Sequence, residues 1–345
     1  MHLETNFPLA GSNTLALHAT AKAFVRPSSD AQISQALDWA RAEGLAVLPL
    51  GEGSNIVLAG DLDLSVLQLA TQGRELLKQS EQDVLLRVQA GENWHQLVQW
   101  TLQQGYYGLE NLALIPGTVG AAPIQNIGAY GVELERFVSA VHGIDLVSAE
   151  RFSLSAKECC FSYRDSIFKQ ALRDKVLITA VDLRLSRQAS AELSYPALQA
   201  ALQERGLCEP TPLEIFSAVV ALRRSKLPDP AIEANAGSFF KNPQLDASQF
   251  LRLQQQFPQM PSYPLLDGGA KVPAAWLIEH CGWKGKKSEG VGVHPGHALV
   301  LVNYSAKDGK CILNLAANIV KSVEQRFGIR LEIEPRVYGA ETGSP

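Results

Sequence analysis

The sequence is poor in cysteine, and its few cysteines do not form the patterns that metal sites and disulfide frameworks use. Five cysteines occur in 345 residues, and none of them belongs to a Cys-x-x-Cys pair. A zinc site and a disulfide framework are therefore disfavoured. The neighbours Cys159 and Cys160 are more simply core or strand residues of a protein in a reducing compartment. A proline and a glycine separate His294 from His297, which prevents a helical ligand pair, so we expect no metal.

Long apolar runs and an excess of basic residues are also missing. No run approaches the ~18 apolar residues of a membrane span, and the amino terminus has no basic segment followed by an apolar one. The net charge of -4, without a basic stripe, gives no support for a nucleic-acid partner. Apolar residues make up 46% and charged residues 19%, which is ordinary for a globular protein. We expect a cytoplasmic protein of two or three domains with neither a membrane nor a nucleic-acid partner.

The most unusual stretch is an uncharged, glycine-rich segment at residues 111–132. Its central part, residues 117–131, contains four glycines and one proline. Glycine allows left-handed backbone and close approach to a ligand, and backbone N–H groups can cradle phosphate. We interpret the segment as a backbone that wraps a ligand. The alternative is a buried turn region that only packs.

A second glycine-containing turn, Gly-Glu-Gly-Ser-Asn, occupies residues 51–55. The dinucleotide fingerprint requires Gly-x-Gly-x-x-Gly at the start of a helix. Here Ile56 stands at the position of the third glycine, and the chain continues as a predicted strand, so a Rossmann site is disfavoured. The turn suits a diphosphate, although taken alone a plain β-turn is the simpler interpretation.

Apolar periodicity predicts the main helices and strands. A strand, a helix capped by Ser29 or Asp30, and a second strand form a βαβ unit whose strands we expect to be parallel. The predicted strands are residues 22–27, 46–50, 56–59, 84–90, 137–146, 151–157, 176–185 and 330–337. The predicted helices are residues 30–43, 92–104, 195–205, 211–226, 273–281 and 312–327.

Several polar residues have both a structural and a functional interpretation. Arg164 lies among aromatic residues, where it either pairs with Asp165 or binds an anion. The cations at the end of helix 211–226 suit the helix dipole or form a rim for a phosphorylated substrate. His95 is most simply a helix-surface histidine. Ser238 lies in Asn-Ala-Gly-Ser-Phe-Phe-Lys-Asn-Pro at 235–243, and because Gly-x-Ser-x-Gly is absent we do not favour hydrolase chemistry.

Seven distinctive segments follow one another along nearly the whole chain. They are Gly-Glu-Gly-Ser-Asn at 51–55, Ala-Gly-Glu-Asn-Trp at 90–94, Leu-Glu-Asn-Leu-Ala-Leu-Ile-Pro-Gly at 109–117, Pro-Ile-Gln-Asn-Ile-Gly-Ala-Tyr-Gly at 123–131, Tyr-Arg-Asp-Ser-Ile-Phe at 163–168, Lys-Leu-Pro-Asp-Pro at 226–230 and the 235–243 segment. Singly the first is weak, but together they are highly specific. In this order they resemble the UDP-N-acetylenolpyruvoylglucosamine reductase family.

The resemblance implies an α+β fold of the vanillyl-alcohol oxidase type, with two FAD-binding subdomains and a C-terminal substrate domain. It places the first subdomain at residues 1–70, to which 330–345 returns, the second at 71–206, and the substrate domain at 207–329. It implies non-covalent FAD, with NADPH as the reductant. The substrate would be UDP-N-acetylglucosamine enolpyruvate, reduced to UDP-N-acetylmuramate for peptidoglycan synthesis. We expect a monomer.

The same resemblance assigns roles to individual residues. Arg164 and Glu334 match the family's residues that stabilise the enol-like intermediate, and Ser238 matches its proton donor. The substrate-contact matches are Tyr195, Lys226 and Asn242, and Tyr263 matches the tyrosine of a closing loop. The expected FAD contacts are Gly51, Gly53, Ser54, Asn55, Gly117, Thr118, Gly120, Ala121, Ala122, Gln125, Asn126, Gly128, Ala129, Tyr130 and Gly131.

Two departures from the family pattern affect these assignments. Ala121 and Ala122 stand where the family often has two serines, so backbone contacts to FAD survive but hydroxyl contacts do not. The final strand lacks the family's proline between its two glutamates. We choose Glu334 because it lies two residues before Arg336, with Glu332 as the alternative.

Two other functions remain open at this point. A different FAD-dependent oxidase or dehydrogenase could use the same fold, although simple alcohol oxidation needs no proton donor such as Ser238. A non-catalytic flavin- or nucleotide-sugar-binding protein would keep the glycine-rich segment without needing Arg164, Ser238 and Glu334 together.

Overall fold

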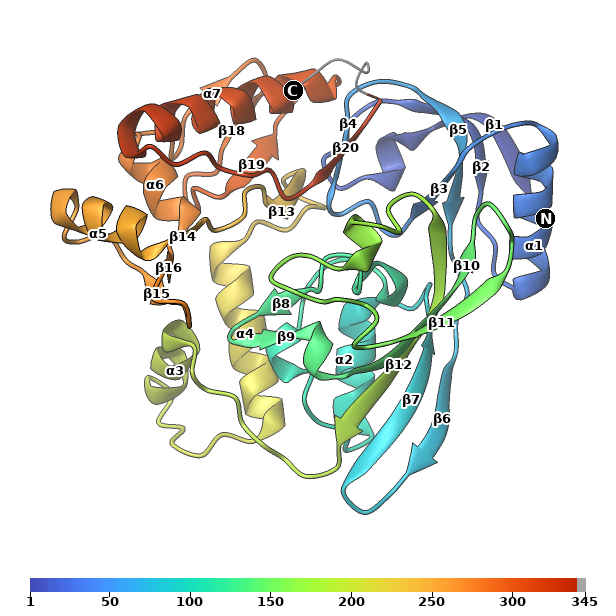
Figure 1. Ribbon diagram of the computed structural model, residues 1–345, viewed down its shortest axis with the longest axis horizontal. Coiled ribbons are helices and arrows are strands. Elements are labelled where there is room, and N and C mark those ends of the chain that lie inside the picture. Colours follow the sequence, from blue (N-terminus) through green and yellow to red (C-terminus); the bar gives the residue numbers. More distant parts are fainter. Residues whose placement is uncertain (340–345) are drawn as a thin grey trace. The chain divides into compact units, whose positions relative to one another are not determined.

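The computed structural model describes residues 1–339, which fall into two compact units (Figure 1). The first unit comprises Met1–Phe7, Ala21–Glu52 and Asp63–Ser225. The second comprises Pro8–Thr20, Gly53–Leu62 and the described chain from Lys226 onward. The expected three-domain division remains a prediction, and residues 340–345 of its last range lie outside the described residues.

A four-stranded sheet begins the first unit, with strand order β1-β2-β5-β3. Its strands are β1 (Leu3–Pro8), β2 (Thr20–Val25), β3 (Val47–Leu50) and β5 (Leu62–Gln68). Helix α1 (Asp30–Ala42) begins at the predicted cap, because the Ser29 hydroxyl accepts a hydrogen bond from Gln32 N–H. Its buried stripe, which includes Ile33 and Leu37, packs with Leu67 of β5. The predicted strands β2 and β3 form, but β5 lies between them and pairs with β3 in parallel.

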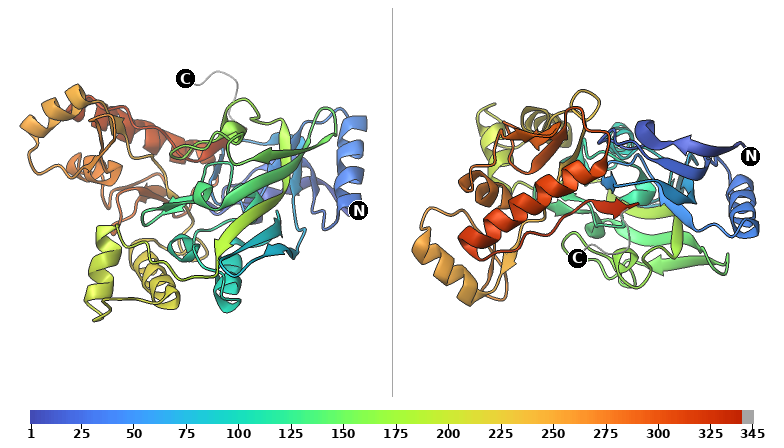
Figure 2. Two further views of the ribbon diagram at one scale, coloured as in Figure 1. Left: turned by 60° about the horizontal axis from the view of Figure 1, so that its bottom comes forward. Right: turned by 90° about the horizontal axis from the view of Figure 1, so that it is seen from above.

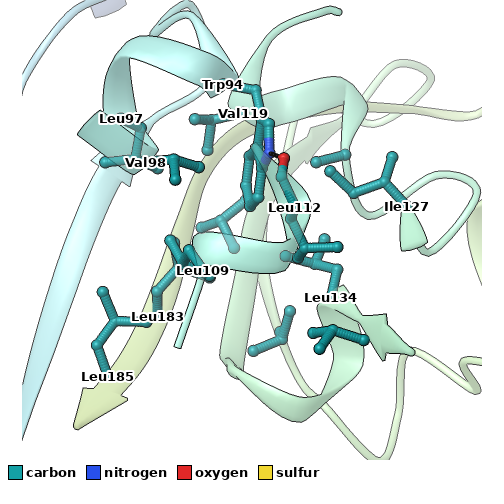
Figure 3. Close-up of a cluster of buried hydrophobic side chains, with 14 of the residues drawn as sticks. Trp94, Leu97, Val98, Leu109, Leu112, Val119, Ile127, Leu134, Leu183 and Leu185 are labelled. Carbon is teal, nitrogen blue, oxygen red and sulfur yellow. Dashed lines mark hydrogen bonds between the residues drawn. The ribbon is translucent and has the colours of Figure 1, made fainter. Parts of the chain in front are cut away.

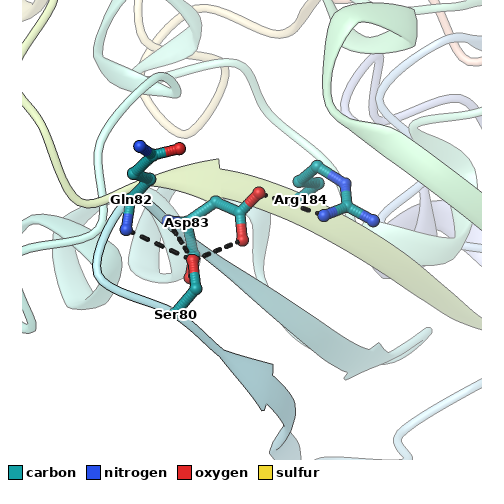
Figure 4. A network of polar contacts seen from close by, with 4 residues as sticks. All are labelled: Ser80, Gln82, Asp83 and Arg184. Atoms are coloured by element: carbon teal, nitrogen blue, oxygen red, sulfur yellow. Dashed lines mark hydrogen bonds and ion pairs between the residues drawn. The ribbon is translucent and has the colours of Figure 1, made fainter.

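The second sheet of this unit has five antiparallel strands in the order β11-β10-β12-β7-β6. They are β6 (Arg74–Gln79), β7 (Asp83–Gln89), β10 (Val138–Asp145), β11 (Arg151–Ser155) and β12 (Val176–Ser186). In the turn between β6 and β7, the Ser80 hydroxyl accepts hydrogen bonds from the N–H groups of Gln82 and Asp83 (Figure 4). The Asp83 carboxylate also pairs with Arg184 of β12, which ties the turn to the neighbouring strand.

Three helices complete the first unit: α2 (Trp94–Gln103), α3 (Pro196–Gln203) and α4 (Pro212–Lys226). Asn93 caps α2 by accepting a hydrogen bond from Gln96 N–H. The apolar face of α2 contributes Trp94, Leu97 and Val98 to the main core of this unit (Figure 3). Inside this core, the Trp94 indole N–H donates to Leu112 O at 2.9 Å. The core therefore holds the start of the glycine-rich segment.

The glycine-rich segment is not a structureless loop, because it contains short helices and a small hairpin. It contains the short 3-10 helices η2 (Glu110–Leu112) and η3 (Val119–Ala121) and the small hairpin of β8 (Gly128–Ala129) and β9 (Val132–Glu133). Two further 3-10 helices of this unit are η4 (Leu134–Arg136) and η5 (Ile167–Lys169). Local hydrogen bonds within the segment allow an uncharged stretch of this length to be ordered.

A four-stranded sheet in the order β13-β19-β18-β17 is the centre of the second unit. Its strands are β13 (Asn235–Ser238), β17 (Lys287–Ser288), β18 (Val291–Val293) and β19 (Val300–Asn303). Helix α7 (Gly309–Phe327) is the long red helix of Figure 2. It packs on β18 with its predicted apolar stripe and ends at Gly328 in left-handed conformation. The remaining elements are η1 (Leu9–Ser12), β14 (Gln244–Leu245), α5 (Ala247–Gln256), β15 (Tyr263–Pro264), β16 (Ala270–Lys271) and α6 (Ala274–His280).

The predicted strand at residues 330–337 is wrong in its extent. Only β20 (Arg336–Tyr338) is a strand, and it pairs in parallel with β4 (Ile56–Leu58). Before it, Ile333 makes an isolated bridge to Phe240. Pro335 divides the two pairings because proline has no N–H to donate to a strand ladder. The two halves of the predicted strand consequently pair with different partners.

Candidate functional site

Glu52 joins the first glycine turn to the glycine-rich segment within the first unit. One carboxylate oxygen accepts a hydrogen bond from the Asn93 side chain at 2.6 Å, and the other accepts from Gly117 N–H at 2.9 Å. Gly51 lies against the same segment, since a Cβ built on it would stand 2.9 Å from Thr118 Oγ1. The two segments approach so closely that a side chain at position 51 would force Thr118 to shift.

Main-chain groups of residues 90–94, at the start of α2 and just before it, hold the next part of the glycine-rich segment. Trp94 N–H donates to Gly117 O at 3.0 Å, and Val119 N–H donates to Glu92 O at 2.9 Å. Gly120 N–H donates to Ala90 O at 2.9 Å. Glycine permits this close approach, because a Cβ at position 120 would lie 2.6 Å from the Ala90 side chain. These bonds fix the backbone of residues 117–120 from one side.

Asn126 organises the second half of the segment. Its side chain is fully buried, and its amide nitrogen donates to Glu133 Oε2 at 2.9 Å and to Ser162 O at 3.1 Å. Its amide oxygen accepts from Glu135 N–H at 3.0 Å. The side chain thus stabilises the left-handed backbone of Asn126, with φ of 44°. A cofactor contact at this position would come from the backbone.

Arg164, a candidate catalytic residue, lies against the same segment. Its guanidinium donates to Gly128 O at 2.7 Å and stands 5.4 Å from the centroid of the Tyr163 ring. The Arg164 backbone is left-handed, with φ of 55°, and Lys169 Nζ donates to its carbonyl at 3.0 Å. Strained backbone at a charged, half-buried residue is typical of functional sites, where the surrounding structure maintains the conformation.

Two candidate contact residues, Tyr130 and Tyr195, meet edge to face in the first unit. Their ring centroids are 5.2 Å apart, with an interplanar angle of 78°. Burial raises the pKa of Tyr130, and the charge of Arg223 partly opposes that rise. The structure therefore brings Tyr130 close to Tyr195 and to Arg223 in the last turn of α4. The other expected FAD residues of the segment are Ala121 in η3, Ala122 and Gln125 after it, Ala129 in β8, and Gly131 in the β8–β9 turn.

Ser238 and Glu334 lie on neighbouring backbone segments of the second unit. Ser238 ends β13 opposite Val300 of β19, directly after Gly237, whose φ of 68° causes a shift in the strand register. The next residue, Phe239, accepts a hydrogen bond at its carbonyl from Glu334 N–H at 2.9 Å. Main-chain pairing therefore brings the two candidate catalytic residues of this unit close together in the chain's fold.

The alternative carboxylate, Glu332, has a different environment. Lys241 N–H donates to Glu332 O at 2.9 Å, and the Lys241 ammonium pairs with the Glu332 side chain. The Glu332 side chain is 68% exposed, whereas Glu334 is half-buried. An exposed carboxylate is a poor candidate for chemistry on a substrate, so burial favours Glu334.

The remaining candidates of the second unit are spread over several elements. Asn242 Oδ1 accepts from Ala274 N–H at 2.9 Å and thereby supports the start of α6. Lys226 is exposed at the end of α4. Tyr263 of β15 is also exposed, with Lys271 Nζ 5.9 Å from its ring centroid. These three residues therefore lie on different elements of the structure.

The rest of the first glycine turn belongs to the second unit. Gly53 has φ of 66°, and a Cβ built on it would stand 2.1 Å from Ser12 O, so no other residue fits. Its carbonyl accepts from Thr14 N–H at 3.1 Å. Ser54 and Asn55 follow it into β4, and Asn55 O accepts from Arg336 N–H at 3.0 Å. The turn is thus built around close backbone contacts.

The described residues do not offer a metal site, and their cysteines are unbonded. Across residues 1–339, no three His, Cys, Asp or Glu side chains gather in an arrangement that would hold a metal ion. His294 pairs with Glu233 at 3.4 Å, and His297 Nδ1 accepts from Leu299 N–H. All five cysteines are free thiols. Among residues 1–339, none of the helices combines the length and hydropathy that a membrane span requires.

The glycine-rich segment fits a cofactor that is held mainly by main-chain contacts. Its residues 111–132 carry no charge, and glycines 51 and 120 occupy positions where a side chain would collide with neighbouring atoms. Side chains and main chain from outside hold its backbone in place. Sites for cofactors such as FAD are usually preformed in this way.

Comparison with known proteins decides the family. Residues 21–150 match the model of the FAD binding domain, and residues 229–338 match that of the UDP-N-acetylenolpyruvoylglucosamine reductase C-terminal domain. The chain is 48% identical over 333 residues to the UDP-N-acetylenolpyruvoylglucosamine reductase of Paraburkholderia phymatum, covering 96% of each chain. It is 44% identical to that of Pseudomonas aeruginosa, covering 98% of this chain and 99% of the relative. The chain belongs to the UDP-N-acetylenolpyruvoylglucosamine reductase family.

A solved structure agrees with this assignment at the level of the fold. The crystal structure of the UDP-N-acetylenolpyruvylglucosamine reductase from Thermus caldophilus superimposes with a TM-score of 0.66, at 23% identity, over 98% of both chains. The predicted family, the α+β fold of the FAD-binding type, the flavin-dependent oxidoreductase class and the FAD cofactor are confirmed. The individual site residues remain predictions.

Sequence reasoning missed two residues that shape the site. Glu52 was only part of a glycine turn, yet its carboxylate bridges two segments. His95 was interpreted as a surface histidine, and this is wrong. The residue is half-buried, its Nδ1 accepts from Leu114 N–H at 3.1 Å, and its ring stacks on Phe216. An Asp or Glu in a glycine turn, and a histidine beside a buried helix face, are the only signals that could have indicated them.

Proposed function

We propose that the chain reduces UDP-N-acetylglucosamine enolpyruvate to UDP-N-acetylmuramate, with FAD as the cofactor and NADPH as the reductant. The observation that carries the proposal is near-full-length similarity to reductases of this name together with the presence of Arg164, Ser238 and Glu334. The product is a precursor of peptidoglycan. Other oxidases of the same fold would not require this set of three residues.

When bound, FAD would supply hydride transfer from the reductant to the methylene carbon of the enolpyruvyl group. The residues that would hold it are those of the two glycine segments, whose backbone is fixed by Glu52, Trp94 and Asn126. The diphosphate would take hydrogen bonds from backbone N–H groups.

Arg164 would stabilise the negative charge that spreads into the substrate carboxylate during reduction. A guanidinium can bind a carboxylate through two parallel hydrogen bonds, and its charge persists at every accessible pH. A positioned donor of this kind contributes about 3–4 kcal/mol to transition-state stabilisation. The contact from Arg164 to Gly128 O supports the proposal, since it holds the guanidinium beside the segment proposed for the cofactor.

Ser238 would donate a proton to the α carbon of the intermediate, while Glu334 would stabilise its enol-like form. A serine hydroxyl is a weak acid, so it requires a neighbouring donor to restore its proton. Glu334 is suited to this site when protonated, because a bare carboxylate would oppose the developing charge. Backbone pairing between Phe239 and Glu334 supports a joint role for the two side chains.

Substrate recognition would fall to residues that contact its charged and aromatic parts. Lys226 suits the diphosphate or the carboxylate, and Asn242 and Tyr195 suit polar groups of the sugar nucleotide. Tyr263 would close over the substrate together with its loop. Its ring is exposed, which is consistent with this role. A cytoplasmic location, a monomeric state and the absence of nucleic-acid and membrane partners also stay predictions.

The flavin spectrum tests the proposal in two steps. The purified protein should be yellow, and NADPH should bleach it under anaerobic conditions. Addition of the enolpyruvyl nucleotide sugar should then restore the colour. Bleaching without recovery would contradict the proposed substrate, and a colourless protein that takes up no FAD would contradict the whole assignment.

A further inference from the structure

Leu114 has a backbone conformation that its side chain disfavours. Its φ is 58°, in the left-handed region, which costs a residue with a Cβ about 1–2 kcal/mol relative to the right-handed region. It stands three residues before Gly117, at the entrance to the segment proposed for FAD. Something must compensate for this conformation, because leucine would not adopt it unaided.

Two side chains from different helices hold the backbone of Leu114. Its N–H donates to His95 Nδ1 of α2 at 3.1 Å. Its carbonyl accepts from Arg223 Nε of α4 at 3.2 Å. Side chains thus bind both polar backbone groups of this strained residue. One of these side chains precedes Leu114 in the sequence, and the other follows it.

The contact fixes the chemical form of His95. A backbone N–H is always a donor, so Nδ1 must be an acceptor and the ring proton resides on Nε2. The ring stacks on Phe216 of α4, with centroids 5.5 Å apart and an interplanar angle of 3°. Stacking holds the plane of the ring in the orientation that aims Nδ1 at Leu114.

Charges around the ring favour its neutral form. Burial lowers the pKa of His95 below its ordinary value, and the nearby cations Arg224 and Arg223 lower it further. Helix α2 carries no other charged residue, and residues 111–132 carry none. On η2, which packs against α2, the Glu110 carboxylate accepts two hydrogen bonds from Gly108 N–H. The ring therefore stays an acceptor at neutral pH.

We propose that His95 is a positioning residue, whose neutral ring and Arg223 together clamp Leu114 in its left-handed conformation and so set the path of the cofactor segment. The inference rests on the proposed role of residues 117–131 in binding FAD. Three residues after the clamp, Gly117 meets Glu52 and Trp94, so a change of direction at Leu114 would misalign those contacts. His95 acts through the backbone and touches neither substrate nor cofactor in this role.

A pair of variants separates the acceptor from the ring. His95→Phe keeps a ring that can stack on Phe216 but removes the acceptor. His95→Asn restores an acceptor oxygen near the position of Nδ1 while losing the ring. The apo-protein should bind FAD roughly three- to tenfold more weakly in the phenylalanine variant, which corresponds to one lost hydrogen bond. The asparagine variant should recover most of the affinity.

Two further readouts are independent of FAD binding. Hydrogen exchange of the Leu114 amide in the apo-protein should be faster in His95→Phe than in the wild type and intermediate in His95→Asn. Leu114→Gly, which tolerates positive φ, should reduce the effect of His95→Phe in the double variant. A merely structural role of the ring would instead follow stacking, so that phenylalanine would be better than asparagine.

The pH dependence of FAD affinity gives the last discrimination. Protonation would place a proton on Nδ1 facing Leu114 N–H, so wild-type affinity should weaken as pH falls through the lowered pKa of His95. The asparagine variant should lack this step. Equal affinity and equal Leu114 exchange in wild type and His95→Phe would overturn the positioning role. A wild type that binds no FAD would overturn the proposed function instead, while the exchange measurement would still judge the clamp.

Discussion

The two units fix their candidate site segments by different means. In the first unit, side chains add to the main-chain bonds that hold the glycine-rich segment, since Glu52 accepts from Gly117 N–H and the Asn126 side chain binds Ser162 O and Glu135 N–H. In the second unit, main-chain hydrogen bonds align the segment after β13 with the segment before β20. Phe239 pairs with Glu334, and Lys241 pairs with Glu332.

Because of this difference, we expect substitutions in the two kinds of segment to have different effects, on ligand binding in one case and on the reaction in the other. Where side chains hold a backbone, replacing one of them changes the shape of the surface that a ligand meets. Where the main chain holds itself, side chains such as those of Ser238 and Glu334 can be replaced with little effect on the fold. We therefore expect variants of the side chains that hold the glycine-rich segment to alter cofactor binding, and variants of Ser238 and Glu334 to alter reaction rates.

Ser238→Ala should have the largest effect on rate. Loss of a positioned proton donor slows a reaction by roughly 10²–10⁴-fold. Flavin reduction by NADPH should persist, while reoxidation by the enolpyruvyl substrate should slow by at least about 100-fold. Anaerobic stopped-flow absorbance separates the two half-reactions. Ser248→Ala, an exposed serine of α5, is the matched control. Equal slowing of both half-reactions would remove Ser238 from the donor role.

The two carboxylates before β20 should differ in their contribution to the same half-reaction. Glu334→Gln should slow reoxidation by the substrate at least about tenfold, because the half-buried group would stabilise the intermediate. Glu332→Gln should leave it within about twofold, since exposed ion pairs contribute little. The same stopped-flow traces compare them. A large effect of Glu332→Gln alone would transfer the catalytic role to that residue.

Glu52→Ala should weaken FAD binding more than Ser238→Ala or Glu334→Gln in the second unit. The substitution removes the acceptor for Asn93 and Gly117 and leaves the Gly117 N–H without its carboxylate. Hydrogen bonds to charged groups contribute about 1.5–3 kcal/mol, so the dissociation constant should rise roughly 10- to 100-fold. Fluorescence titration of the apo-protein measures it. Glu43→Ala, at the exposed end of α1, should have no effect. Unchanged affinity in Glu52→Ala would break the comparison between the units.

Local patterns in the sequence predicted most helices because their signals lie within a few residues. Ser29 caps α1 three residues before Gln32, and the stripe of α7 repeats every turn up to Gly328. The final strand was predicted too long because alternation alone ignores Pro335, which removes a ladder donor. Propensity describes a segment, but pairing depends on what lies opposite.

Site geometry was less predictable because it depends on contacts between distant segments. Glu52 meets Gly117 at a separation of 65 residues, and Arg223 meets Leu114 at 109. Neither contact leaves a periodic signal in the sequence. The family resemblance supplied candidate residues such as Arg164, while the left-handed backbone of Arg164 and the clamp on Leu114 became visible only in the structure.

A cluster on the five-stranded sheet extends the comparison from binding to stability. Asp182 of β12 accepts hydrogen bonds from Arg87 of β7 at 2.8 and 2.9 Å, and its other neighbour is His142 of β10 at 2.8 Å. The Asp182 side chain is 8% exposed. Burial raises the pKa of Asp182, but the hydrogen bonds from Arg87 and His142 outweigh burial and hold it below the ordinary value.

Asp182→Asn should lower the free energy of unfolding by about 2 kcal/mol, less than a fully buried pair because Arg87 is one-third exposed. A depressed carboxyl pKa stabilises the fold above the unfolded value, about 3.9, and this stabilisation disappears as pH falls through the folded value. The difference between wild type and variant should thus be constant above pH ~5 and shrink below pH ~4. Urea unfolding at several pH values measures it. Glu332→Gln should change the free energy of unfolding by less than about 0.5 kcal/mol at every pH, because main-chain bonds hold the segment of Glu332. A change as large as that of Asp182→Asn would contradict the distinction between the two units.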